Sequence, residues 1–264
     1  MATQSRPDLN PSPDPGEPTV AESELAGGVA TRENDDVTVR PSADRDPSHI
    51  VGLVSSAEDL AAVSELLCAL PAECAAALII VQHFGSGHKR SLAEALAMRT
   101  SRPVIQATDG MVAEQDHVYV TPASAILTMT GRRIRVGPNG GGLHPPGDIL
   151  FTSLAKEHGD SAVGVVLSGA GSDGAVGVQA IKRAGGIAFA QYPGSARFPG
   201  MPISAIETEC VTFVLRPNEI ARELSRLSRE AARAAGAARP MLVIDENAAP
   251  PARRIMVSRS SIAS

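Results

Sequence analysis

The chain has 264 residues, of which 43% are apolar, and its formal net charge at pH 7 is -5. This length allows one domain with a large core, but tryptophan is absent and aromatic residues make up only 3%, so Ala, Val, Leu and Ile must build the interior. The acidic balance, without a dominant basic stripe, argues against nucleic acid as a partner, and no run of about 18 apolar residues predicts membrane insertion.

The two ends differ in composition from the middle. Residues 1–48 carry ten acidic and four basic side chains, and residues 1–47 are rich in Pro, Ser, Asp and Glu without a sustained period. We therefore expect a disordered acidic tail over 1–47, one domain over 48–236, and a largely disordered tail over 237–264. The amino terminus lacks an apolar signal segment, and the three cysteines show no CxxC spacing, which favours a cytoplasmic protein with free thiols and no metal site.

Strand-like and helix-like segments alternate along the central domain. Apolar runs at 49–54, 78–82, 162–167 and 187–190 predict strands, and helical spacing follows them at 60–70, at 92–96, from about 175 to 184, and after Pro217. A further helix is predicted from about Asp148. This order predicts a doubly wound, mostly parallel α/β sheet in a Rossmann-like three-layer αβα arrangement.

The middle of the domain departs from this alternation. Short apolar runs at 117–120, 126–129 and 133–136 are separated by turns, and Gly131-Arg132 joins the last two as in a hairpin. We expect these runs to form a small antiparallel insertion.

Three polar residues follow predicted parallel strands. Ser56 follows the first strand, His83 the second, and Asp173 lies in the Gly-rich segment after the strand at 162–167. Because the carboxyl ends of parallel strands face one crevice, a nucleophile, a general base and its orienting carboxylate are predicted to meet there.

Each signal also has a simpler interpretation. Ser56 to Asp59 matches a helix capping box, His83 fits a solvated loop residue, and Asp173 fits a cap of the helix that begins beside it. The pattern Gly169-x-Gly171-x-x-Gly174 resembles a dinucleotide fingerprint, but the next strand ends in Gln191, where such sites place an acidic residue. The catalytic interpretation therefore rests on the three residues together.

Residues from about 49 to 228 resemble the catalytic domain of chemotaxis protein-glutamate methylesterases of the CheB type. The resemblance rests on five ordered motifs, which are Val81-Gln82-His83, Val118-Tyr119-Val120-Thr121-Pro122, His144-Pro145-Pro146-Gly147-Asp148-Ile149-Leu150-Phe151, Ser168-Gly169-Ala170-Gly171-Ser172-Asp173-Gly174 and Gly200-Met201-Pro202.

The resemblance implies a hydrolase that removes glutamate γ-methyl esters from the cytoplasmic domains of methylated chemoreceptors and deamidates certain glutamines. It implies Ser56 as nucleophile, His83 as base and Asp173 as orienting carboxylate, with no cofactor. The amide of Ala170, where the family usually has Met, matches an oxyanion donor. The further residues expected to stabilise the oxyanion or bind substrate are Ala57, Gly200, Met201 and Pro202.

Two departures from the family bear on activity. The nucleophile loop is usually Gly-x-Ser-x-Gly-Gly, whereas here it reads Val54-Ser55-Ser56-Ala57-Glu58-Asp59, which adds bulk and negative charge near a developing oxyanion. The usual amino-terminal receiver domain is not expected within residues 1–47, so regulation would come from a separate receiver or kinase protein, or be absent. A catalytically weakened paralogue that binds receptors or partner proteins is the alternative.

Overall fold

The computed structural model describes residues 46–72, 74–83, 92–139 and 144–237, with the backbone alone at His83 and at 235–237. The tails predicted at the two ends fall almost entirely outside these ranges and stay predictions. Within the described ranges, no helix has both the length and the apolar character needed to cross a membrane.

Seven parallel strands form the main sheet, in the order β3-β4-β2-β1-β7-β8-β9. The first strand, β1, lies at the centre of this sheet. Strands β2, β4 and β3 follow on one side of it, and β7, β8 and β9 follow on the other. The strand bounds are β1 His49–Ser56, β2 Ala76–His83, β3 Val104–Gln106, β4 Val118–Val120, β7 Val163–Val166, β8 Ile187–Gln191 and β9 Phe213–Leu215.

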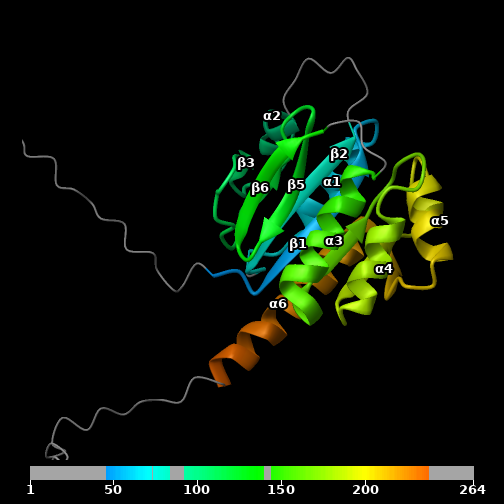
Figure 1. Cartoon of the computed structure of the whole chain (residues 1–264). Coiled ribbons are helices and arrows are strands. Elements are labelled where there is room, and N and C mark those ends of the chain that lie inside the picture. The colour runs from blue at the N-terminus through cyan, green and yellow to red at the C-terminus, as the bar shows by residue number, and fades with distance from the viewer. Residues whose placement is uncertain (1–45, 73, 84–91, 140–143, 238–264) are drawn as a thin grey trace, which may run out of the picture. The chain divides into compact units, whose positions relative to one another are not determined.

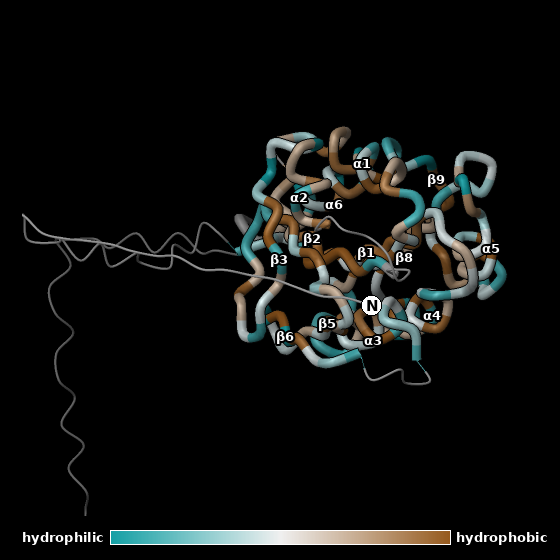
Figure 2. The backbone as a smooth tube through the Cα atoms, turned by 90° about the horizontal axis from the view of Figure 1, so that it is seen from above, coloured by the Kyte–Doolittle hydropathy of each residue, from teal (hydrophilic) through white to brown (hydrophobic). Residues whose placement is uncertain are grey.

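Helices cover both faces of this sheet, as the view along the layers in Figure 2 shows. One face packs against α1, α2 and α6, and the other against α3, α4 and α5. The helix bounds are α1 Leu60–Ala69, α2 Leu92–Ala97, α3 Pro146–His158, α4 Ala175–Arg183, α5 Gly200–Glu207 and α6 Pro217–Ala237 (Figure 1). The predicted doubly wound, three-layer α/β fold is confirmed.

Alternation along the central strands divides the core in two. In β1, Ile50 and Val54 pack with the α3 side, whereas Val51 and Leu53 pack with the α1 side. Successive side chains of a strand point to opposite faces, so a strand covered on both faces becomes a continuous apolar run. These continuous apolar runs are the pattern from which the central strands were predicted.

One part of the predicted insertion is wrong. The run at 117–120 contains β4, which pairs in parallel with both β2 and β3 inside the main sheet. A three-residue strand is too short to show its pairing partner in the sequence, and burial of all three residues is set by the neighbouring strands. The short strands β3 and β9 and the helix α5 were not predicted at all.

The remaining part of the insertion is an antiparallel hairpin, as predicted. Strands β5 (Ala125–Thr130) and β6 (Arg133–Pro138) pair with Thr130 opposite Arg133, which leaves Gly131-Arg132 as the two-residue connection. Gly131 has a φ of 52°, a conformation that glycine adopts without steric cost. The hairpin packs into the same core as α3 through three buried side chains, those of Leu127, Met129 and Ile134.

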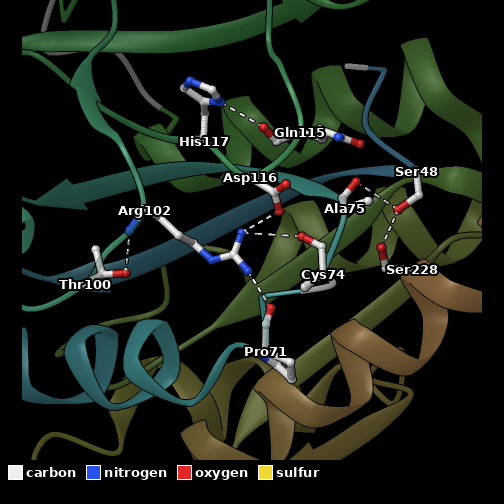
Figure 3. A network of polar contacts seen from close by, with 10 residues as sticks. All are labelled: Ser48, Pro71, Cys74, Ala75, Thr100, Arg102, Gln115, Asp116, His117 and Ser228. Atoms are coloured by element: carbon white, nitrogen blue, oxygen red, sulfur yellow. Dashed lines mark hydrogen bonds and ion pairs between the residues drawn. The ribbon is translucent and has the colours of Figure 1, made fainter. Parts of the chain in front are cut away.

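A polar network joins the loops at the amino ends of the strands (Figure 3). The guanidinium of Arg102 donates to the carbonyl oxygens of Pro71 at 2.6 Å and Cys74 at 3.4 Å, and to the Asp116 carboxylate at 2.7 Å. Arg102 thereby connects the loops that enter β2, β3 and β4. This network lies at the amino ends of the strands, opposite the edge where Ser56 and His83 end β1 and β2.

Candidate active site

Ser56 is the last residue of the central strand β1. Its backbone N–H donates to the Ser168 carbonyl at 3.0 Å, which ties β1 to the loop after β7. Its hydroxyl oxygen accepts the Glu58 N–H at 3.3 Å. Helix α1 begins only at Leu60, with Asp59 at the N-cap position and no side-chain cap bond, so the capping-box interpretation of Ser56 is wrong.

The neighbouring serine occupies a different environment. Ser55 is fully buried, and its hydroxyl accepts a hydrogen bond from the Gln82 amide at 3.2 Å, whereas Ser56 keeps 9% exposure. Strand alternation sends these two side chains to opposite faces, which places Ser56 on the face covered by α3, α4 and α5. Of the two hydroxyls, only that of Ser56 faces the side from which Asp173 approaches.

His83 ends the adjacent strand β2 and pairs with Ser56 in the parallel register. Directly opposed residues in neighbouring strands have their Cα atoms about 4.8 Å apart, so the backbone positions of the predicted nucleophile and the predicted base are adjacent. Gln82, which precedes His83, donates its side-chain amide to the Ser56 carbonyl at 3.1 Å. Sequence reasoning did not assign Gln82 this role, although Gln82 belongs to the Val81-Gln82-His83 motif.

Asp173 lies in the loop between β7 and α4. Strand β7 is the neighbour of β1 on the side opposite β2. Its carboxylate accepts the N–H groups of Gly147 and Asp148, each at 3.0 Å, in the first turn of α3. The N-cap residue of α4 is Gly174, with no side-chain cap bond, so Asp173 does not cap its own helix as the simpler interpretation held. These two amides fix the position of the Asp173 carboxylate against the start of α3.

Gly147 allows the close approach of Asp173 to α3. A Cβ atom at Gly147 would lie 2.7 Å from Asp173 Oδ1 and 2.5 Å from Val54 Cγ2, so Gly147→Ala must displace the carboxylate. We expect the kcat of the predicted ester hydrolysis to fall about 10²-fold, which is the effect of a displacement near 1 Å in an active site. The control is Gly137→Ala in β6, where the nearest atom is an ordinary 3.4 Å away. Equal kcat values for both variants would contradict this expectation.

The predicted oxyanion donor, Ala170, lies in the loop after β7. Ala170 is exposed, and within the described part of the chain its N–H donates no hydrogen bond. Beneath it, a Cβ at Gly169 would lie 2.1 Å from the Met201 sulfur and 3.1 Å from the Ser56 nitrogen, so only glycine fits there. Ala170 is thereby presented at the surface beside the end of β1.

The residues predicted from the Gly200-Met201-Pro202 motif begin α5. Met201 is 1% exposed and donates its N–H to the Gly169 carbonyl at 2.8 Å, and Pro202 is also buried. The burial of Met201 and Pro202 favours packing against the loop that carries Ala170 over the predicted contact with substrate. Sequence reasoning missed Gln191, whose side-chain oxygen accepts the Ser168 N–H at 2.8 Å and so anchors the start of the same loop.

The dinucleotide interpretation fails at the amino end of α4. A pyrophosphate would need the N–H groups of this helix, but the Asp148 carboxylate already accepts the Gly177 N–H at 2.7 Å. In the part of the chain that the structure describes, no group of three or more His, Cys, Asp or Glu residues is arranged to hold a metal ion.

Comparison with known proteins agrees with the fold described above. The model of the CheB methylesterase family matches residues 51–224. The chain belongs to this family. The crystal structure of the Thermotoga maritima CheB methylesterase catalytic domain superposes with a TM-score of 0.61 at 26% identity, over 68% of this chain and 98% of that domain.

Relatives of known name are longer. A protein-glutamate methylesterase/protein-glutamine glutaminase of Anaeromyxobacter dehalogenans is 37% identical over 67% of this chain and 53% of its own length. A protein of the same designation from Rhizobium meliloti is 34% identical over 72% of this chain and 54% of its own length. An uncharacterised 104.1 kDa protein of Rhodobacter capsulatus is 46% identical, over 47% of this chain and 13% of its own length. The chain thus spans about half the length of the named CheB relatives.

Two acidic residues, Glu58 and Asp59, distinguish the nucleophile loop of this chain from that of the CheB family. Glu58 and Asp59 both precede α1, with Asp59 at the N-cap, so the helix has no acidic residue in its first turn. Glu58 is exposed, whereas Asp59 is 5% exposed. The buried carboxyl of Asp59 is therefore the stronger candidate for destabilising an oxyanion that develops beside Ser56.

Proposed function

We propose that this domain is a protein-glutamate methylesterase that hydrolyses glutamate γ-methyl esters on the cytoplasmic helices of chemotaxis-type receptors. The observation that carries the proposal is the register of Ser56 with His83 at the carboxyl ends of β1 and β2, beside the loop that holds Asp173. The family match and the names of the relatives support the same reaction. Deamidation of glutamine follows from the same chemistry with ammonia as the leaving group.

In this mechanism Ser56 attacks the ester carbonyl carbon while His83 takes the hydroxyl proton. The tetrahedral oxyanion accepts hydrogen bonds from backbone amides, of which Ala170 is the proposed donor and Ala57 a second. His83 returns the proton to the methoxide leaving group, and methanol departs. Water then attacks the glutamyl-enzyme with His83 again as base, which restores Ser56 and releases the carboxylate.

Asp173 orients the His83 imidazole and stabilises its cationic form in both steps. Two N–H donors from α3 fix the position of the Asp173 carboxylate for this role. The reaction needs no cofactor. The proposed partners are methylated receptor domains and a separate receiver or kinase protein, with the cytoplasm as the place of action.

The test is methanol release from a purified receptor cytoplasmic fragment carrying methylated glutamates. We expect stoichiometric methanol and a matching loss of methyl ester from the fragment, measured with the full chain. A fragment that keeps its methyl esters and its glutamines during prolonged incubation would overturn the proposed activity.

The acidic loop should slow acylation. Each like charge near the oxyanion costs about 1–4 kcal/mol at 4 Å, depending on the effective dielectric, and 1.36 kcal/mol is a tenfold change in rate. The double variant Glu58→Gly, Asp59→Gly should therefore acylate about tenfold faster or more in single-turnover measurements. The fold should tolerate the change because glycine at an N-cap costs only a few tenths of a kcal/mol relative to Asp.

The single variant Glu58→Gly is the matched control for this prediction. Because Glu58 is exposed, its part of the effect should shrink at high salt, whereas the part due to Asp59 should persist. A folded double variant that acylates no faster than wild type at either salt concentration would show that these acids do not limit the reaction.

A further inference from the structure

A second buried carboxylate lies beside Asp173 and has no role in the proposed reaction. Asp148, in the first turn of α3, is 5% exposed and its Oδ1 accepts the Gly177 N–H of α4 at 2.7 Å. Asp173, from the loop before α4, accepts the first N–H groups of α3 in return. The start of α4 is thus bound by a carboxylate of α3, and the start of α3 is bound by a carboxylate of the loop that leads into α4.

The packing around this pair brings the two helix starts close together. A Cβ at Gly177 would lie 2.5 Å from Phe151 Cβ and 3.1 Å from Asp148 Cα, so glycine is needed where α4 passes α3. Gly174, which joins Asp173 to α4, has a φ of 93° and would meet Val54 and Val166 at 2.9 Å. The Asp173 loop is therefore held between α3 and α4, and a shift of either helix start moves its carboxylate.

The arrangement is costly in free energy. Burial raises the pKa of the Asp148 carboxyl, and the negative charge of Asp173 raises it further, whereas hydrogen bonds from the backbone at the start of α4, of which that of Gly177 is the strongest, lower it. An uncharged acceptor would satisfy the Gly177 N–H without burying a second carboxylate. What Asp148 contributes beyond local stability is the position of α4 relative to the Asp173 loop.

We propose that Asp148 is a positioning residue of the active site, which fixes the Asp173 carboxylate by holding the start of α4 through Gly177. The proposal rests on the hydrolytic function proposed above. Asp148 touches neither substrate nor the reacting atoms, so its loss should lower kcat and leave the KM for the receptor fragment nearly unchanged.

The first comparison is between Asp148→Ala and Ser153→Ala. Ser153 lies on the same helix and accepts the Met129 N–H at 3.0 Å, so its loss also removes a tertiary hydrogen bond of α3 but leaves α4 untouched. We expect kcat to fall about 10²-fold in Asp148→Ala with less than a threefold change in KM, and to stay within threefold of wild type in Ser153→Ala. Equal kcat in the two variants would overturn the proposal.

The second comparison separates acceptor geometry from charge and does not require Asp148→Ala to fold. Asp148→Asn keeps an oxygen acceptor at the same reach, whereas Asp148→Glu keeps the charge but adds a methylene. If position is what matters, kcat stays within about threefold of wild type in the Asn variant and falls at least tenfold in the Glu variant. The reverse order would overturn the proposal.

A third measurement is independent of turnover. The Gly147 amide donates to Asp173, so its hydrogen-exchange protection reports whether the carboxylate stays in place. Protection should fall at least tenfold in Asp148→Glu and stay unchanged in Asp148→Asn and Ser153→Ala. Unchanged protection in Asp148→Glu would overturn the positioning role even if the receptor fragment proved not to be a substrate, whereas an inactive wild type would count against the function alone.

Discussion

Ser56→Ala is expected to lower kcat for methanol release by about 10⁴-fold or more, the scale at which loss of a serine nucleophile acts in other serine hydrolases. The fold should persist, because the hydroxyl only accepts the Glu58 N–H at 3.3 Å, a bond worth about 0.5–1.5 kcal/mol. The measurement combines methanol release with thermal unfolding of the same preparation.

Ser55→Ala is the matched control, since it removes the same hydroxyl one residue earlier in β1. Ser55 is fully buried on the opposite face and interacts with Gln82, which keeps its second bond to the Ser56 carbonyl in this variant. Activity should remain within tenfold of wild type. If both variants lost activity equally, or Ser55→Ala alone did, the assignment of the nucleophile to Ser56 would be wrong.

Asp173→Asn has the second largest expected effect, a loss of about 10³–10⁴-fold in kcat. The carboxylate accepts two α3 amides, and an asparagine NH₂ would face one of them as a donor against a donor. This unpaired contact should also lower the free energy of unfolding by about 1–3 kcal/mol. The variant therefore combines a poorly oriented base with a weakened junction of α3 and α4.

Asp160→Asn provides the control for Asp173→Asn, because Asp160 is an exposed carboxylate in the short 3-10 helix after α3. It should leave both kcat and the unfolding temperature unchanged. A folded Asp173→Asn variant that keeps kcat within tenfold of wild type would remove Asp173 from the mechanism. Steady-state methanol release at saturating receptor fragment is the deciding measurement.

Local sequence patterns were sufficient for the elements that build the sheet. Apolar runs over 49–54 and 78–82 predict strands buried on both faces, and β1 and β2 contain them. Because each run ends in a polar residue, Ser56 and His83 were correctly placed at strand ends. The Gly131-Arg132 hairpin was equally readable, since a two-residue turn with glycine between short apolar runs has few other conformations.

Short-range patterns failed where partners distant in sequence decide the structure. The three residues of β4 carry no sign of parallel pairing with β2 and β3, which end at His83 and Gln106, well before β4 along the chain. The capping box at Ser56 is a valid local motif, yet pairing with β2 extends β1 through Ser56 and delays α1 to Leu60. Tertiary pairing outweighs a cap because it satisfies several backbone groups at once.

The sequence by itself determined the fold class, the family and the candidate triad, because those depend on periodicity and on motifs of adjacent residues. Only the tertiary structure decided that Asp173 binds the start of α3 while Asp148 binds the start of α4, since all three hydrogen bonds join residues at least 25 positions apart. Helix N-termini attract carboxylates from any element that reaches them, and which carboxylate arrives is set by packing around glycines. That packing has no signature within either helix alone.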